Sequence, residues 1–361
     1  MKLENYELHL PSYSVGKEVY NQIGKICKPY GTKVLVIGGK KALSAAFDKI
    51  SKNAADGGLD IIGKEIYGTD CTYEAVERLA ALTSFQEADM VFAVGGGKAI
   101  DTCKCLCIEC EKPVFTFPTI ASNCAACTSV SIMYHEDGTF FKPHFFTHPA
   151  AHAFIDTQII AAAPYRYLWA GIGDTYAKNY EAEISSRGEK LPHYTKVGFS
   201  KMCLTPMLEY GRQALEDNKK GVATEALEQV ALAIVVTTAI VSIFLTRDFT
   251  PDYNSGLAHA CFYALTAYPV IEKEHLHGEV VGFGVLYALL VDGQQEEFEK
   301  IYALNKELGL PVRIADIGIT EEQFFETMDR IPQMSDIRHY PYAVTKEMLM
   351  QAYETIEQLP V

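Results

Sequence analysis

The sequence is poor in positive charge, and this limits the partners it can bind. Acidic residues outnumber basic ones by 46 to 32, which gives a formal net charge of -14 and an isoelectric point near 5.2. Binding to nucleic acid depends on Lys and Arg side chains that neutralise phosphates, and the chain has no basic run. We therefore expect no nucleic-acid partner.

Long apolar segments are also missing. The most apolar stretch, residues 230–245, contains Thr237, Thr238 and Ser242. It is shorter than the roughly 20 residues of a membrane span, so it predicts a helix buried in a helical domain. Residues 1–5 have no apolar signal core, so we expect a cytoplasmic protein with no membrane partner.

Low-complexity tracts are absent, and the balance of 48% hydrophobic and 22% charged residues is that of an ordinary globular protein. With 361 residues, the chain is long enough for two domains, each with its own core. Because no export signal is evident, the ten cysteines are expected to be reduced thiols rather than disulfides.

Four cysteines lie close together in the sequence, at Cys103, Cys105, Cys107 and Cys110. Such a group could form a metal cluster. However, Cys103, Cys107 and Cys110 follow the i, i+4, i+7 spacing of a buried helix stripe, where cysteine acts as a small apolar residue. We favour this structural interpretation.

In the first part of the chain, short β-rich runs alternate with helical patterns. The runs at 33–37, 89–94 and 114–117 each end at glycine or proline. This alternation is typical of a parallel sheet covered by helices.

The pattern changes after about Pro164, where long helical periods such as 215–245 and 296–308 dominate. We predict an α/β nucleotide-binding domain over residues 1–163, followed by an all-helical domain over residues 164–361 that carries the metal and the substrate.

Two polar loops follow neighbouring strands of the predicted sheet. Gly95-Gly96-Gly97-Lys98 opens a helical run, and glycines there let backbone N–H groups and the positive helix end approach a pyrophosphate. It is neither the GxGxxG fingerprint nor a Walker loop, and alone it is equally explained as a tight turn. The second loop, residues 118–124, favours a nucleotide site, because ligands bind beyond the carboxyl ends of parallel strands.

Asp174, His259 and His277 are candidate metal ligands. Two imidazoles and one carboxylate can hold a divalent cation and leave positions open for a substrate. Their spacing is a weak signal, since His148 and His152 at i and i+4 match a ligand pattern better. For any one histidine, a structural role is the alternative.

Taken in order, these motifs resemble the iron-containing (group III) alcohol dehydrogenase family, and within it the glycerol dehydrogenase-like branch. The resemblance implies an N-terminal Rossmann-like domain, an all-α C-terminal domain as in dehydroquinate synthase-like folds, and an active site between them. The motifs span nearly the whole chain: Gly95-Gly96-Gly97-Lys98 with Asp101, Pro118-Thr119-Ile120-Ala121-Ser122, Gly171-Ile172-Gly173-Asp174, Ala258-His259-Ala260 and His277-Gly278-Glu279.

The resemblance also implies residue roles. It makes Asp174, His259 and His277 ligands of zinc or iron, which would polarise a substrate oxygen while a nicotinamide supplies or accepts the hydride. We expect a small-molecule substrate and a homo-oligomer. The implied cofactor-binding residues are Gly95, Gly96, Gly97, Lys98, Asp101, Thr119, Ser122, Thr128, Val130 and Tyr134.

The chain departs from the glycerol dehydrogenase pattern at the substrate positions. Those enzymes typically carry an aspartate where this chain has Cys124, and a His-Asn pair where it has Phe262-Tyr263. The sequence therefore favours a substrate other than glycerol.

Lys178 lies four residues after Asp174, which the motif places near the start of a helix, and so shares a helix face with it. A lysine there can pair with a substrate carboxylate, and Cys124 removes a charge that would repel one. These residues resemble the hydroxycarboxylate dehydrogenase subgroup, which reduces 2-oxo acids, so we predict a 2-oxo acid and 2-hydroxy acid pair. Alternatively, Lys178 reaches solvent or pairs with Glu181.

The end of the predicted strand at residues 33–37 bears on the cofactor. An acid there binds the ribose hydroxyls of NAD, whereas a basic residue accommodates the extra phosphate of NADP. This chain has Gly38-Gly39-Lys40-Lys41 and no acid. Gly39 and Lys40 therefore predict a preference for NADP(H) over NAD(H).

Three other functions are also compatible with the sequence. One is a glycerol or polyol dehydrogenase that uses NAD. Another is a lyase related to dehydroquinate synthase, although the chain lacks a dense basic set for a phosphate monoester. The third is a non-catalytic binding module, favoured only if Asp174, His259 and His277 hold no metal.

Overall fold

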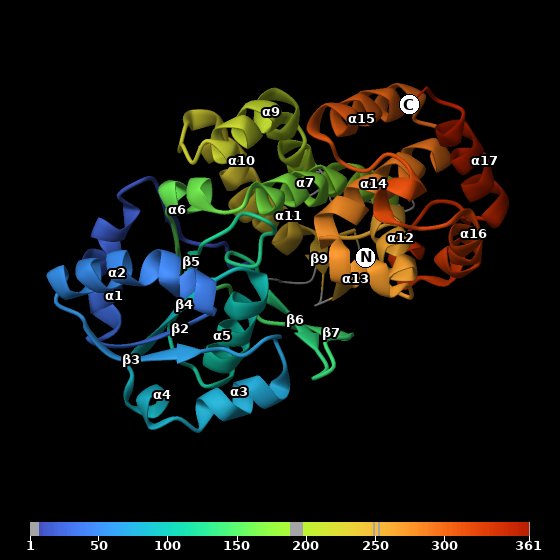
Figure 1. Cartoon of the computed structure of the whole chain (residues 1–361). Coiled ribbons are helices and arrows are strands. Elements are labelled where there is room, and N and C mark those ends of the chain that lie inside the picture. Colours follow the sequence, from blue (N-terminus) through green and yellow to red (C-terminus); the bar gives the residue numbers. More distant parts are fainter. Residues whose placement is uncertain (1–6, 188–197, 248–249, 252, 361) are drawn as a thin grey trace. The chain divides into compact units, whose positions relative to one another are not determined.

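In the computed structural model of the chain, the described residues are 7–187, 198–247, 250–251 and 253–360 (Figure 1). They fall into two units. The sheet unit comprises Met1–Pro164 and Asp217–Ile243, and the helical unit comprises Tyr165–Glu216 and Phe244–Val361. The domain division at residues 163 and 164 stays a prediction, and these units differ from it because residues 217–243 pack with the first unit.

A six-stranded parallel sheet is the centre of the sheet unit, in the order β1-β8-β5-β4-β2-β3. The predicted α/β architecture is confirmed, and the runs at 33–37, 89–94 and 114–117 form β2, β4 and β5. The elements are β1 (Tyr13–Val15), η1 (Val19–Gln22), α1 (Ile23–Cys27), η2 (Lys28–Tyr30), β2 (Lys33–Gly38), α2 (Lys40–Asp56), β3 (Asp60–Ile66), α3 (Tyr73–Ala80), α4 (Thr83–Glu87), β4 (Met90–Gly95), α5 (Gly97–Glu109), β5 (Val114–Pro118), β6 (Val130–Tyr134), β7 (Phe140–Phe145), β8 (His152–Ile155), α6 (Thr157–Ala162), α10 (Glu225–Leu232) and η4 (Ala233–Thr237).

The central strands are apolar throughout because both faces of the sheet are covered. Val36 and Phe92 belong to a core cluster with residues of α2, while the alternating neighbours Leu35 and Val91 are also fully buried on the opposite face. Such continuous apolar runs are visible in a sequence. The hairpin of β6 and β7 has no such run, and it was not predicted.

The strand order creates a branch point between β2 and β4. These strands are paired neighbours, but the chain continues from β2 to β3 on one side and from β4 to β5 on the other. The loops that follow them, at Gly38-Gly39 and Gly95-Gly96-Gly97, therefore diverge from the carboxyl edge of the sheet. In open α/β sheets, ligands bind in the crevice at such a point.

Helix α5 corrects one detail of the cysteine prediction. Cys103 and Cys107 are fully buried as expected, and so is Cys105. Cys110 is exposed instead, because α5 ends at Glu109 and Cys110 is its C-cap. The buried stripe ends where the helix does.

The helical unit is built around α7, which packs against α14, while α12 also packs against α14 (Figure 1). Its elements are α7 (Tyr165–Ser186), η3 (Lys201–Cys203), β9 (Thr246–Arg247), β10 (Thr250–Pro251), α12 (Leu257–Leu265), α13 (Pro269–Glu274), α14 (His277–Val291), α15 (Gln295–Leu308), η5 (Ile314–Ile317), α16 (Glu321–Arg330), η6 (Ile331–Gln333), η7 (Ser335–Ile337) and α17 (Lys346–Glu357). Two helices continue from one unit into the other, α9 (Thr205–Lys219) and α11 (Thr238–Leu245).

Glycines bring α7 and α14 into unusually close contact. A Cβ on Gly173 would collide with the carbonyl oxygen of Gly278, and a Cβ on Gly278 would collide with that of Ala170. The motif before Asp174 is therefore a helix-packing motif. Asp174 lies in the middle of α7, not near a helix start as predicted.

The predicted long helix over residues 215–245 is interrupted. Gly221 adopts a positive φ of 69° between α9 and α10, and Thr224 caps α10. From Glu225 to Leu245 the chain then forms one helix that is long and apolar enough to cross a membrane, with 61% of its apolar window buried. This helix is longer than the apolar stretch at residues 230–245. A buried core helix has the same length and composition.

Candidate metal and cofactor sites

Asp174, His259 and His277 come together in the helical unit, from α7, α12 and α14. One ligand atom from each lies within 4.8 Å of the other two. The Nε2 atoms of His259 and His277 are 3.7 and 3.6 Å from Oδ1 of Asp174, and the two imidazole centroids are 5.2 Å apart. Residues scattered over a hundred positions of sequence therefore form one donor set.

Glu181, which sequence reasoning did not assign to this site, fixes the orientation of His259. Its fully buried carboxylate accepts the backbone N–H groups of Gly256 and His259 at 2.8 and 2.9 Å. The other oxygen lies 2.6 Å from Nδ1 of the His259 ring. Nδ1–H donates to this carboxylate, so the lone pair of Nε2 faces Asp174, as in metal sites with a carboxylate behind the histidine ligand. Glu181 follows Asp174 by seven residues on α7, a spacing that could have revealed it.

The second imidazole, His277, begins α14 and is partly exposed, with 41% of its side chain accessible. Phe262 packs edge-on against it, with ring centroids 4.4 Å apart. Behind the helix end, Glu279 accepts the backbone N–H of Leu276 and contacts Nδ1 of His275 at 2.7 Å. The motif His277-Gly278-Glu279 thus combines a donor, a packing glycine and a helix cap.

The charges at this cluster favour a cation. Burial raises the pKa of Asp174, but the hydrogen bond and charge of His277 and the charges of His259 and Lys178 outweigh it and lower this pKa to about 2. Burial lowers the pKa of His259, but the Glu181 carboxylate and the charge of Asp174 together outweigh it, so the net shift of this pKa is upward. A buried, ionised carboxylate beside two imidazoles is a suitable ligand set for zinc, iron or a similar divalent ion.

Lys178, one turn after Asp174 on α7, is buried, with 7% of its surface exposed. Its Nζ donates to the backbone oxygen of Asn254 at 2.5 Å and to the side-chain oxygen of the same residue at 3.3 Å. The two alternative predictions for Lys178 were that it reaches solvent or pairs with Glu181. Both are wrong, because Lys178 is buried and the Glu181 carboxylate is hydrogen-bonded to the start of α12 instead. Within the described part of the chain, no carboxylate lies within ion-pair distance of Nζ.

The histidine pair favoured by spacing is not a metal site. His152 is buried in β8, where its ring bonds to the hydroxyls of Ser12 and Ser14 at 2.7 and 2.9 Å, and burial lowers its pKa to about 4. His148 precedes this strand and contacts Thr147. The two do not share a helix, so the i, i+4 spacing has no meaning here.

In the sheet unit, the triple-glycine loop packs tightly against the loop after β5. A Cβ on Gly96 would lie 2.6 Å from Ile120, and one on Gly97 would lie 2.8 Å from the side-chain amide of Asn123. The two polar loops predicted from the sequence are thus in contact at the carboxyl edge of the sheet. Only glycines allow this approach, and they leave the start of α5 accessible to a phosphate.

Lys98 and Tyr134 lie together beside this loop. The Lys98 ammonium is 4.8 Å from the centre of the Tyr134 ring and pairs with Asp70. Lys98 is exposed, so a pyrophosphate could compete with Asp70 for it. Among the other implied cofactor residues, Thr119 and Thr128 are buried and Ser122 and Val130 are half-buried. The predicted substrate residue Cys124 is also half-buried.

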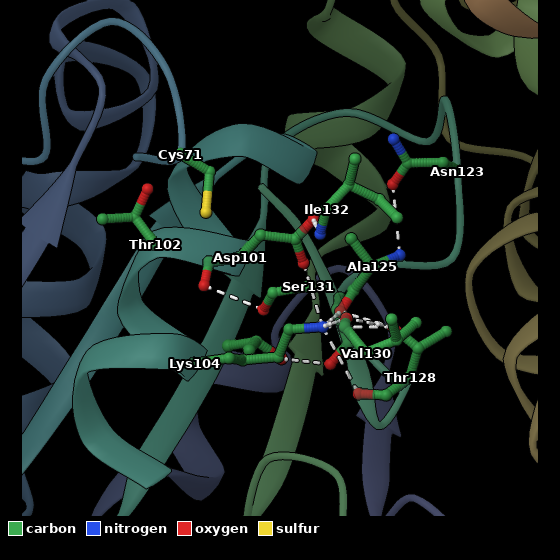
Figure 2. A network of polar contacts seen from close by, with 12 residues as sticks. Cys71, Asp101, Thr102, Lys104, Asn123, Ala125, Thr128, Val130, Ser131 and Ile132 are labelled. Atoms are coloured by element: carbon green, nitrogen blue, oxygen red, sulfur yellow. Dashed lines mark hydrogen bonds and ion pairs between the residues drawn. The ribbon is translucent and has the colours of Figure 1, made fainter. Parts of the chain in front are cut away.

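Asp101 and Lys104 form the centre of a buried polar network below the loop (Figure 2). The Lys104 ammonium is 3.0 Å from Oδ1 of Asp101, and Oδ2 accepts the backbone N–H of Ile132 at 3.1 Å. The same ammonium donates to the backbone oxygens of Ala125 and Val130 at 2.8 and 2.5 Å. Burial raises the pKa of Asp101, although the Lys104 charge partly opposes it. The contacts of Asp101 are internal ones, and its proposed contact with a cofactor stays a prediction.

The comparisons with known proteins agree with this arrangement. Residues 11–156 match the model of the family described as "Iron-containing alcohol dehydrogenase". A glycerol dehydrogenase of Escherichia coli O6:H1 is 32% identical over 321 residues, covering 86% of this chain and 84% of that protein. Hydroxycarboxylate dehydrogenase A of Escherichia coli K12 is 29% identical over 334 residues, covering 90% of each.

A solved structure shows the same fold. Glycerol dehydrogenase from Schizosaccharomyces pombe superposes with a TM-score of 0.84 over 98% of this chain and 91% of that one, at 22% identity. The chain belongs to the iron-containing alcohol dehydrogenase family, in its glycerol dehydrogenase-like branch, and is an oxidoreductase that acts on CH–OH groups with an NAD(H)-type cofactor and a divalent metal.

Proposed function

We propose that the enzyme interconverts a small 2-oxo acid and the corresponding 2-hydroxy acid, and that it prefers NADP(H). The observation that carries the proposal is the buried ammonium of Lys178, one helical turn from the metal-binding carboxylate of Asp174. A 2-oxo acid carries its carboxylate on the carbon next to the reacting carbonyl, so a cation close to the metal-ligand set would be able to pair with it.

Lys178 is suited to binding a ligand because its partners among the described residues are neutral. A buried charge is costly unless it is paired, and Asn254 offers only dipoles. An incoming carboxylate would form a charge-assisted hydrogen bond in a site shielded from water. Cys124 supports the same substrate class, because a neutral side chain replaces an acid that would repel a carboxylate.

The residues of the donor set have distinct tasks in this reaction. Asp174, His259 and His277 would hold the cation, and Glu181 would keep His259 oriented with Nε2 toward it. When bound, the divalent metal supplies Lewis-acid polarisation of the substrate oxygen, and the nicotinamide supplies or accepts the hydride. The apolar ring of Phe262, which packs against His277, would restrict the space for a substrate on that side of the donor set.

The cofactor preference rests on the end of β2, at the branch point of the sheet. Gly39 caps α2, and the first turn of that helix contains no acidic residue. Lys40 and Lys41 are exposed there, so a 2′-phosphate would meet positive charge where NAD enzymes present a carboxylate to the ribose.

The deciding experiment is a substrate panel with both cofactors after metal reconstitution. We expect higher kcat/KM for 2-oxobutanoate or 2-oxoglutarate than for glycerol or dihydroxyacetone. Lys178→Met should raise KM for the oxo acids by about 10- to 100-fold, the value of one charged hydrogen bond. Dihydroxyacetone, which has no carboxylate, is the matched control. An unchanged KM for the oxo acids would remove Lys178 from substrate binding.

Cofactor choice has its own test. We expect higher kcat/KM with NADPH than with NADH, and we expect Gly39→Asp to reverse the ratio. The new side chain fits, since a Cβ at Gly39 meets only Tyr67 at 3.5 Å, an ordinary contact. A clear preference of the unmodified enzyme for NADH would show that Lys40 does not select the cofactor.

A second candidate is a glycerol or polyol dehydrogenase that uses NAD. It is favoured by the relatives, since the proteins from Escherichia coli O6:H1 and Thermotoga maritima, each 32% identical to this chain, are both named glycerol dehydrogenase. Rapid NAD-dependent oxidation of glycerol, with slow turnover of oxo acids, would establish it. A homo-oligomeric state is part of either proposal and is measurable by light scattering.

A further inference from the structure

A second set of metal-ligand side chains lies in the sheet unit. Cys105, Glu109 and His144 offer one thiol, one carboxylate and one imidazole, with one ligand atom of each within 4.8 Å of the others. None of the three belongs to the candidate metal and cofactor sites described above. The set also differs in chemistry from that of Asp174, which contains no sulfur.

Two elements bring these side chains together. Cys105 and Glu109 are four residues apart on α5, so they share one face of the helix. His144 lies on β7, which pairs with β6 in a register that places His144 opposite Ser131. The Ser131 hydroxyl donates to the backbone oxygen of Asp101 on α5 at 2.9 Å, as Figure 2 shows. The hairpin is therefore fixed against α5, and His144 with it.

His144 is also supported from behind. The Tyr73 hydroxyl lies 2.9 Å from Nδ1, and the ring stacks on Phe146 with centroids 4.9 Å apart. When Nδ1–H donates to the Tyr73 oxygen, Nε2 presents its lone pair on the side of Glu109, whose Oε1 is 3.4 Å away. Histidine ligands of metals are typically held in this manner by a partner on the other ring nitrogen.

The distances fit a tetrahedral cation. The Cys105 sulfur is 3.9 Å from Oε1 of Glu109, which is itself 3.4 Å from Nε2 of His144, and one ligand atom of each residue lies within 4.8 Å of the other two. Zinc bond lengths of about 2.3 Å to sulfur and about 2.0 Å to nitrogen or oxygen imply ligand atoms roughly 3.3–3.6 Å apart. Small side-chain rotations would bring the three donors to those separations.

We propose that Cys105, Glu109 and His144 form a second binding site for a zinc-like divalent transition metal, with a fourth position open to water. Binding converts the Cys105 thiol to a metal-bound thiolate and releases one proton to solvent, with no change of oxidation state. Access is from the side of Glu109 and His144, whose side chains are 45% and 23% exposed. A thiolate and an imidazole select such ions over magnesium or calcium.

The site has a structural consequence. A cation there would connect α5, which begins at the triple-glycine loop, to the hairpin of β6 and β7. Because the unfolded chain does not present this geometry, binding stabilises the folded sheet unit by mass action.

Cobalt titration of the full-length protein tests the proposal, because cobalt bound to a thiolate gives a sulfur-to-metal charge-transfer band in the near ultraviolet. The Asp174 set has no sulfur, so the band reports only on a cysteine site. We expect the band in the unmodified protein and its loss in Cys105→Ser. It should persist in Cys110→Ser and Cys124→Ser, which change the exposed and half-buried cysteines.

Glu109→Gln provides a variant that does not threaten folding, since this side chain is partly exposed. We expect it to keep the band but to weaken cobalt affinity by at least about tenfold, the loss typical of removing even an outer partner of a metal site. Absence of the band in the unmodified protein, its persistence in Cys105→Ser, or unchanged affinity in Glu109→Gln would each overturn the proposal.

Discussion

Each of the two units contains a buried lysine that follows an aspartate by about one turn of the same helix. The two lysines differ in the charge of the groups that surround them. Lys104 in α5 follows Asp101 by three residues, and Lys178 in α7 follows Asp174 by four. The Lys104 ammonium has a carboxylate and backbone oxygens around it. Among the residues that the structure describes, the Lys178 ammonium bonds only to the two oxygens of Asn254.

This difference indicates that Lys104 is a structural cation, whereas Lys178 is suited to binding a ligand. In α5 the acid and the base satisfy each other, and the network joins the helix to the segments around Ala125 and Val130. In α7 the aspartate faces two imidazoles, and the lysine has no anionic partner among the described residues. A buried charge without an anionic partner lowers the free energy of unfolding. We therefore interpret Lys178 as a ligand-binding residue rather than a structural one.

The largest effect is expected for Lys104→Met. Removing this ammonium leaves the buried Asp101 carboxylate without its counter-ion. Removing one partner of a buried ion pair typically lowers the free energy of unfolding by about 3–5 kcal/mol. The measurement is the free energy of unfolding in urea. The double variant Lys104→Met with Asp101→Asn is the control, and it should cost less than the sum of the two single changes. Strict additivity would mean that the pair is not coupled.

A matched pair of aspartate variants sharpens the comparison. Asp101→Asn should lower the free energy of unfolding by about 1–3 kcal/mol, because its buried ionic contacts are weakened, and should leave metal content unchanged. Asp174→Asn should reduce zinc or iron affinity by about 100-fold or more, since it removes a proposed direct ligand. Elemental analysis of both purified variants decides this. Loss of metal in Asp101→Asn would contradict the assignment of separate roles.

The sequence could predict the sheet because its cause is local. A buried parallel strand must be apolar throughout and must end at a turn, and both features of β2, β4 and β5 are visible in short windows. The burial of Lys104 is not local. Its acceptors come from residues 125–130, so only the Asp101-Lys104 spacing was available as a signal.

The metal donors show the same limit more strongly. Asp174, His259 and His277 were candidates by their chemistry and became the predicted ligands only through the family resemblance, while spacing favoured His148 and His152, which the fold separates. The contribution of Glu181 was missed because carboxylates on helices are usually solvated. The glycines near Asp174 predicted a helix start, but their role is to admit α14. Each of these features depends on contacts between helices that are far apart in the sequence, so short windows of sequence do not reveal it.

The smallest effect on stability is expected for Lys178→Met. The methionine fills the space of the lysine stem, and the desolvation cost of the ammonium disappears together with its bonds to Asn254. We expect the free energy of unfolding to change by less than about 1.5 kcal/mol. Lys104→Met, measured in the same urea series and at equal metal content, is the reference. If Lys178→Met is as damaging as Lys104→Met, the two lysines are both structural, and the oxo acid proposal loses the observation that carries it.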